Sequence, residues 1–85
     1  MHDAAQIADL IRKIESVAEA QGARRVVGVT VVLGDDSLSA ERLGEHFRIA
    51  ARGTAADGAR LAIKMSGGAG VHPGAVLLES VEVEE

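Results

Sequence analysis

The chain has 85 residues, of which 47% are hydrophobic and 26% charged, and this composition is typical of one globular domain. A net charge of −4 and a single aromatic residue, Phe47, argue against a phosphate-binding surface with stacked bases, so we expect no nucleic-acid partner. The sequence has no run of 18 apolar residues and no basic start followed by the apolar region of a signal peptide. We therefore expect one domain over residues 1–85, a cytoplasmic location and no membrane partner.

Cysteine is absent from the sequence. This excludes disulfides, thiol chemistry and every cysteine-based zinc site. No serine, histidine and acid triad and no pair of carboxylates occurs at a recognisable spacing, so we expect no catalytic residues and a protein that is not an enzyme.

An amphipathic helix is predicted from Asp3 to Gln21, with Asp3 as its N-cap and Gly22 as its left-handed terminating residue. Its apolar residues recur at spacings of three and four and form one stripe. The stripe comprises Ile7, Leu10, Ile11, Ile14, Val17 and Ala18.

The β-branched run from Val26 to Leu33 predicts a central strand, ended by Gly34. Alternation places Val27, Val29, Val31 and Leu33 on one face. The other face carries Val26, Gly28, Thr30 and Val32 and is also rather apolar. A homodimer contact would explain this, and so would a short strand that is buried on both faces.

A turn follows, in which the adjacent Asp35 and Asp36 are better explained as turn formers than as metal ligands. Ser39 is the expected N-cap of a second helix that ends at Gly53. Its apolar stripe is narrower and comprises Leu43, Phe47, Ala50 and Ala51. His46 is expected at the flank of this packed face, in a structural role.

Alternation resumes from Ala59 to Ser66 and predicts a second strand, followed by a glycine-rich connector over residues 67–74. His72 of this connector could donate to a metal, but a solvated loop histidine without such a role is the better explanation. The inward residues should be Leu61, Ile63 and Met65, and the outward ones Arg60, Ala62 and Lys64.

The last strand is predicted from Ala75 to Glu84. Val76 and Leu78 have one parity and Val81 and Val83 the other, so both pairs can face inward only if a β-bulge lies near Glu79 and Ser80. The order helix, strand, helix, strand, strand predicts an α+β fold, with two helices packed on one face of a three-stranded mixed β-sheet.

The start of the chain carries the candidate metal ligands. A free α-amine on Met1, the backbone nitrogen of His2 and its imidazole can close small chelate rings on a divalent metal. This nitrogen-rich, near-planar set suits Ni(II) or Cu(II) better than Zn(II) or Mg(II). For Asp3, helix capping is the alternative to metal ligation.

The chain resembles the HypA/HybF family of hydrogenase nickel-incorporation proteins. The resemblance covers most of the chain in the family's order. Its first features are the Met1-His2-acidic start, the first helix, and Gly22-Ala23-Arg24-Arg25-Val26 before a strand that ends Leu33-Gly34. Its later features are Ala50-Ala51-Arg52-Gly53-Thr54 at the exit of the second helix, Asp57-Gly58-Ala59 before the next strand, and the closing Glu79-Ser80-Val81-Glu82-Val83-Glu84.

The resemblance implies transient Ni(II) binding by Met1, His2 and Asp3, and maturation proteins of a nickel enzyme or the hydrogenase large subunit as partners. Asp3 stands where the family usually has glutamate. The family's zinc domain, built on two CxxC pairs, is replaced here by the 67–74 connector, so no zinc is expected.

Two hypotheses follow for the function. In the first, the chain is a nickel metallochaperone that assists nickel insertion, most plausibly into a [NiFe]-hydrogenase. In the second, it is a zinc-free paralogue that serves as a protein-interaction or dimerisation module and delivers no metal. His2 favours the first, and the missing cysteine set favours the second.

Overall fold

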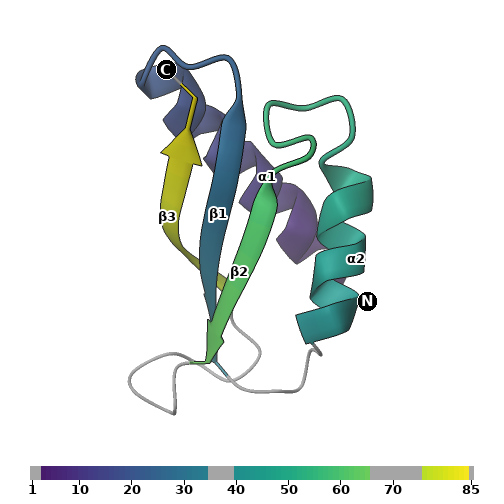
Figure 1. Cartoon of the computed structure of the whole chain (residues 1–85). Coiled ribbons are helices and arrows are strands. Elements are labelled where there is room, and N and C mark those ends of the chain that lie inside the picture. The colour runs from purple at the N-terminus through teal and green to yellow at the C-terminus, as the bar shows by residue number, and fades with distance from the viewer. Residues whose placement is uncertain (1–2, 35–39, 66–75, 85) are drawn as a thin grey trace.

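The computed structural model of the chain describes residues 3–34, 40–65 and 76–84. They form two helices and three strands in the order α1 (Asp3–Ala20), β1 (Val26–Leu33), α2 (Ala40–Ala50), β2 (Arg60–Met65) and β3 (Val76–Val83). The sheet has the order β2-β1-β3, in which β2 runs parallel and β3 antiparallel to β1 (Figure 1). This arrangement confirms the predicted α+β fold with a three-stranded mixed sheet.

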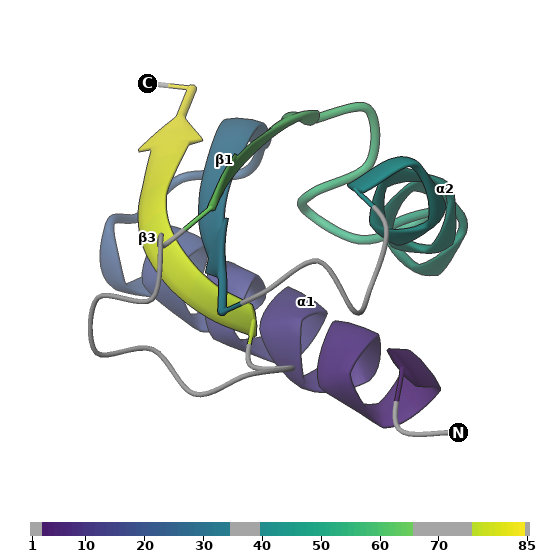
Figure 2. The same ribbon diagram turned by 90° about the horizontal axis from the view of Figure 1, so that it is seen from below.

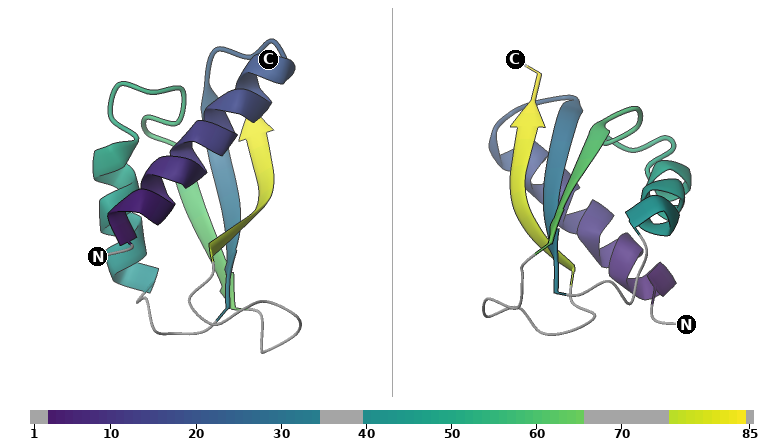
Figure 3. Two further views of the ribbon diagram at one scale, coloured as in Figure 1. Left: turned by 180° about the vertical axis from the view of Figure 1, so that it is seen from behind. Right: turned by 60° about the horizontal axis from the view of Figure 1, so that its bottom comes forward.

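Both helices lie on the same face of the sheet, and no described helix or strand covers the opposite face (Figures 2 and 3). Helix α1 crosses behind the sheet and contacts β3 and α2. Helix α2 stands beside the β2 edge (Figure 2). The core between these layers is almost wholly aliphatic, and its buried residues are Ile7, Leu10, Ile11, Ile14, Ala18, Val26, Val29, Val31, Leu33, Leu43, Phe47, Ala51 and Ala56.

Helix α1 ends in a Schellman motif, as its terminal glycine predicts. Gly22 has φ +68°, its N–H donates to the Glu19 carbonyl at 3.0 Å, and the Ala23 N–H donates to the Ala18 carbonyl at 2.9 Å. Val17 is exposed and not part of the buried stripe as predicted, because it lies at the edge of the arc that the other apolar residues occupy.

A tight loop between Ala51 and Ala59 joins α2 to β2 and is organised by side-chain hydrogen bonds. The Thr54 hydroxyl donates to the Ala51 carbonyl at 2.7 Å and accepts from the Ala56 N–H at 3.1 Å. The Asp57 carboxylate accepts from the Gly53 N–H at 3.0 Å. Gly53 has φ +78° and ends the helical segment as predicted. On α2, Ala51 is buried and Ala50 is exposed, so the predicted stripe was wrong at Ala50.

The predicted bulge in β3 is confirmed. Thr30 pairs with Ser80 and the next residue, Val31, pairs with Leu78, so Glu79 is the extra residue. Because of this bulge, both apolar pairs of the strand are half-buried toward the helices: Val76, Leu78, Val81 and Val83.

A second bulge, in β1, was not predicted. Val26 pairs with Val83 and Gly28 with Glu82, so Val27 is extra on the β1 side. The predicted alternation was therefore wrong at two positions: Val26 is buried, and Val27 is 38% exposed on the open face. Met65 is also exposed and not inward as predicted, because it ends an edge strand.

Candidate metal site and its surroundings

Helix α1 fixes the position at which the predicted metal ligands enter the fold. It begins at Asp3, and Ile7, about one turn further along, is already buried. Leu10, Ile11 and Ile14 continue the buried stripe and pack the helix into the core. Met1, His2 and the Asp3 side chain lie outside the described part of the structure. The fold therefore defines the anchor of the predicted site, while its ligand set stays a prediction.

An apolar groove lies between the first half of α1 and α2, beginning about one turn after Asp3. It has a volume of about 280 Å³ and is lined by Ile7, Ala8, His46, Ile49 and Ala50. Ile49 is 56% exposed here, and His46 is also exposed. His46 thus lies at the flank of the packed face of α2, as predicted, and it shares the groove with Ile7 and Ala8 of α1. Helix α2 and the start of α1 lie on the same side of the fold (Figures 1 and 2).

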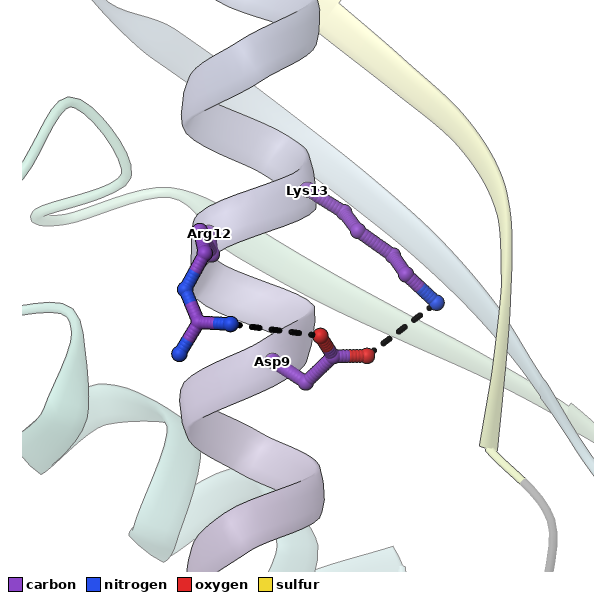
Figure 4. A network of polar contacts seen from close by, with 3 residues as sticks. All are labelled: Asp9, Arg12 and Lys13. Atoms are coloured by element: carbon purple, nitrogen blue, oxygen red, sulfur yellow. Dashed lines mark ion pairs between the residues drawn. The ribbon is translucent and has the colours of Figure 1, made fainter.

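Two acidic residues are adjacent in sequence to lining residues of this groove, Glu45 before His46 and Asp9 after Ala8, and Asp9 is already paired. Its carboxylate lies 3.1 Å from the Lys13 ammonium and 3.6 Å from the Arg12 guanidinium (Figure 4). All three side chains are more than half exposed, so the contacts are i,i+3 and i,i+4 surface pairs of the kind that stabilise a helix weakly.

No group of three or more histidine, cysteine, aspartate or glutamate side chains that could hold a metal occurs among residues 3–34, 40–65 and 76–84. The other residues considered from the sequence as metal donors or turn formers, Asp35, Asp36 and His72, lie outside these ranges, as does the N-cap candidate Ser39. Within the described ranges, His46 is the only histidine, and it is not part of a group of three such side chains.

A second groove, of about 220 Å³, separates α2 from the start of β2. Small residues dominate its wall, which explains why the space between the helix and the edge of the sheet is not filled by side chains. The lining residues are Gly44, Phe47, Arg48, Ala51, Ala56, Gly58, Ala59 and Leu61. Arg48 is its only charged residue, so this groove carries no set of groups for proton transfer or metal binding.

The open face of the sheet carries polar contacts that sequence reasoning missed. The Lys64 ammonium on β2 lies 2.8 Å from the Glu79 carboxylate on β3, although β1 runs between these strands. Glu82 lies over Gly28, where an added Cβ would meet its carboxylate. Alternation had predicted that Lys64 points outward. The ion pair depends on the strand order β2-β1-β3, for which the sequence carries no direct signal.

Comparison with known protein families and with curated proteins found no match for the chain. None of the helices in the described ranges is long and apolar enough to cross a membrane.

Proposed function

We propose that the chain is a nickel metallochaperone, which holds Ni(II) transiently at its amino-terminal end and passes it to a nickel enzyme under assembly. The Met1 α-amine, the His2 backbone nitrogen and the His2 imidazole supply the donors, and the Asp3 carboxylate supports the site. Nickel is cargo in this scheme, so the site must bind it reversibly. The expected recipients are maturation proteins or the large subunit of a [NiFe]-hydrogenase, in the cytoplasm.

One observation carries the proposal: α1 begins at Asp3 and is packed into the core from Ile7 onward. Met1 and His2 therefore directly precede, and Asp3 begins, a helix that is packed into the core.

A second function is favoured by a different observation. The sheet has an uncovered face on which Leu77 is 48% exposed, and cysteine is absent from the chain. Both fit a zinc-free paralogue that retains the fold for protein association and carries no metal. The two functions differ in one measurable property, which is nickel binding at the chain start.

Calorimetric titration of the untagged chain with Ni(II) tests the proposal. We expect one site per chain, lost in His2→Ala and lost in a chain with a few extra residues before Met1. The extension leaves the imidazole in place and converts the amine into an amide, which is a far poorer donor. His46→Ala is the matched control, since it removes the described exposed histidine and should leave binding unchanged.

Two further conditions define the ligand set. Binding should weaken below about pH 6.5, where protons compete with the metal for imidazole nitrogen. Zn(II) should compete poorly with Ni(II) if coordination is near-planar, and well if the ligands are arranged as a tetrahedron. Undiminished binding by the extended chain would remove the amine from the site, and no binding by the native chain would favour the association module.

A further inference from the structure

The open face of the sheet divides into three columns of different charge. The central column, on β1, is uncharged and presents Val27, Gly28, Thr30 and Val32. The β2 column presents two cations, Arg60 and Lys64, on either side of Ala62. The β3 column presents Glu79, Glu82 and the exposed Leu77. The charged residues of the face thus originate at its two edges, the cations on β2 and the anions on β3, and the Glu82 carboxylate reaches over Gly28 of the central column.

The strand register aligns these charges in rows. Gly28 pairs with Arg60 on one side and with Glu82 on the other, which gives one charged row. Val32 pairs with Lys64 and with Leu77, and Lys64 reaches Glu79 across this row. The two rows are separated by Thr30, which pairs with Ala62 and Ser80. The first row therefore has a cation on β2 and an anion on β3. In the second row the β3 residue is Leu77, and Glu79 is the bulged residue between the Thr30 and Val31 pairs.

This pattern is complementary to itself under one particular symmetry. A two-fold axis that lies between two stacked faces and runs along β1 keeps the height of each row and exchanges the two edges. The β2 column of one copy then faces the β3 column of the other, so Arg60 opposes Glu82, and Lys64 opposes the stretch of β3 from Leu77 to Glu79. An axis across the strands would instead place β2 over β2, with like charges opposed.

We propose that a second copy of this chain packs on the open face, with the two-fold axis along β1. The contact buries Val27, Val32 and Leu77 and opposes the neutral columns, in the manner of two aligned sheets. In the single chain, Lys64 and Glu79 neutralise each other across Val32. In the dimer, Lys64 and Glu79 of one copy instead pair with Glu79 and Lys64 of the other. These charges are therefore paired in the single chain and in the dimer, whereas the exposed parts of Val27 and Leu77 become covered only in the dimer.

The size of the face sets the strength of the association. Three short strands offer a contact at the lower end of specific interfaces, so we expect a dissociation constant on the order of 10–100 µM. The pairing should also depend on salt, because the Debye length falls from about 10 Å at 0.1 M to about 3 Å at 1 M ionic strength. The inference is independent of nickel binding.

Sedimentation equilibrium of the untagged chain over a range of concentrations tests the inference. We expect a reversible shift toward twice the 8.8 kDa of the chain, weakened in 1 M salt. Two charge-reversal variants sharpen the test: Arg60→Glu/Lys64→Glu makes both edges acidic, and Glu79→Lys/Glu82→Lys makes both edges basic. Each variant alone should stay monomeric, with dimerisation weakened at least tenfold by opposed like charges.

Mixing the two variants gives the decisive result, since every acidic edge then opposes a basic edge, and we expect a heterodimer to form. Arg12→Glu/Lys13→Glu is the matched control, because it changes the net charge equally on the exposed side of α1 and should dimerise like the native chain. If a charge-reversal variant does not fold, Thr30→Lys replaces it, as it places a charge at the centre of the contact.

Three results would each overturn the inference. The native chain could stay monomeric at several times the expected dissociation constant, the dimer could survive both reversals, or the folded variants could stay monomeric when they are mixed.

Discussion

The two faces of the same three-stranded sheet differ in what their residues do. Toward the helices, Val26, Val29, Val31 and Leu33 of β1 are buried almost completely. On the opposite face, over which no described helix lies (Figure 3), the same strand presents Val27, Thr30 and Val32, which are exposed or half-buried. Sequence composition alone does not separate the two sets, since both are largely β-branched. The difference is made by the helices and by two β-bulges.

This comparison shows how one short strand can serve both stability and recognition. The covered face holds α1 in place and thereby fixes the point at which Met1 and His2 join the fold. The open face adds little to the core, so it is free to carry a charge pattern. We therefore expect substitutions on the covered face to change the free energy of unfolding, and substitutions on the open face to change association.

The largest effect is expected for Phe47→Ala. Phe47 is the only aromatic residue, is 2% exposed and packs into an otherwise aliphatic core. Its truncation should lower the free energy of unfolding by about 3 kcal/mol, near the low end for phenylalanine because the neighbouring groove allows some relaxation. Ile49→Ala, on the same helix but exposed, should change it by less than about 0.5 kcal/mol. A loss below about 1 kcal/mol for Phe47→Ala in urea denaturation would place the ring outside the core.

A smaller effect is expected for Val31→Ala in β1, and its comparison with Val27→Ala tests the difference between the two faces of the sheet directly. Val31→Ala removes two buried methyl groups and should cost about 2 kcal/mol of unfolding free energy. Val27→Ala makes the same chemical change on the open face and should cost less than about 0.5 kcal/mol. Both variants are measured by denaturation at a concentration at which the chain is monomeric. Equal losses would contradict the difference in burial between the two faces.

The smallest effect on the free energy of unfolding is expected at Gly22, which ends α1 and begins its connection to β1. Gly22→Ala forces a side chain into a left-handed backbone conformation and should destabilise the fold by about 1 kcal/mol. Gly44→Ala, inside α2 with nothing within 4 Å of the added Cβ, should stabilise it by up to about 1 kcal/mol. Thermal unfolding of the pair should therefore show shifts of opposite sign, and shifts of the same sign would contradict the assigned roles of the two glycines.

The fold could be predicted where the sequence carries a local signal. The bulge at Glu79 was predictable because the apolar residues of β3 change parity there. The bulge at Val27 was not, because β1 is apolar at both parities and a shift by one residue leaves no mark on the pattern. Met65 was misassigned because alternation shows which way a side chain points, but not whether another element covers the end of an edge strand.

The candidate site also has parts that could be predicted from the sequence and parts that could not. Helix α1 and its start at Asp3 could be predicted from periodicity and from Gly22, and the structure confirms the helix. The proposed donors Met1 and His2 come from the sequence and the family resemblance alone. The cross-strand pair of Lys64 and Glu79 could not have been predicted, because it requires that β1 lie between two strands that are neighbours in sequence.

The central claim is that nickel is held at the start of α1, and backbone amide NMR spectra recorded during a Ni(II) titration test it most directly. We expect the resonances of the first turn of α1 to shift or broaden as nickel is added, with saturation at one ion per chain. The resonances of the open sheet face, such as Gly28 and Thr30, should stay unchanged at constant protein concentration. Changes centred on His46, or no change at the start of α1 at saturating nickel, would contradict the claim.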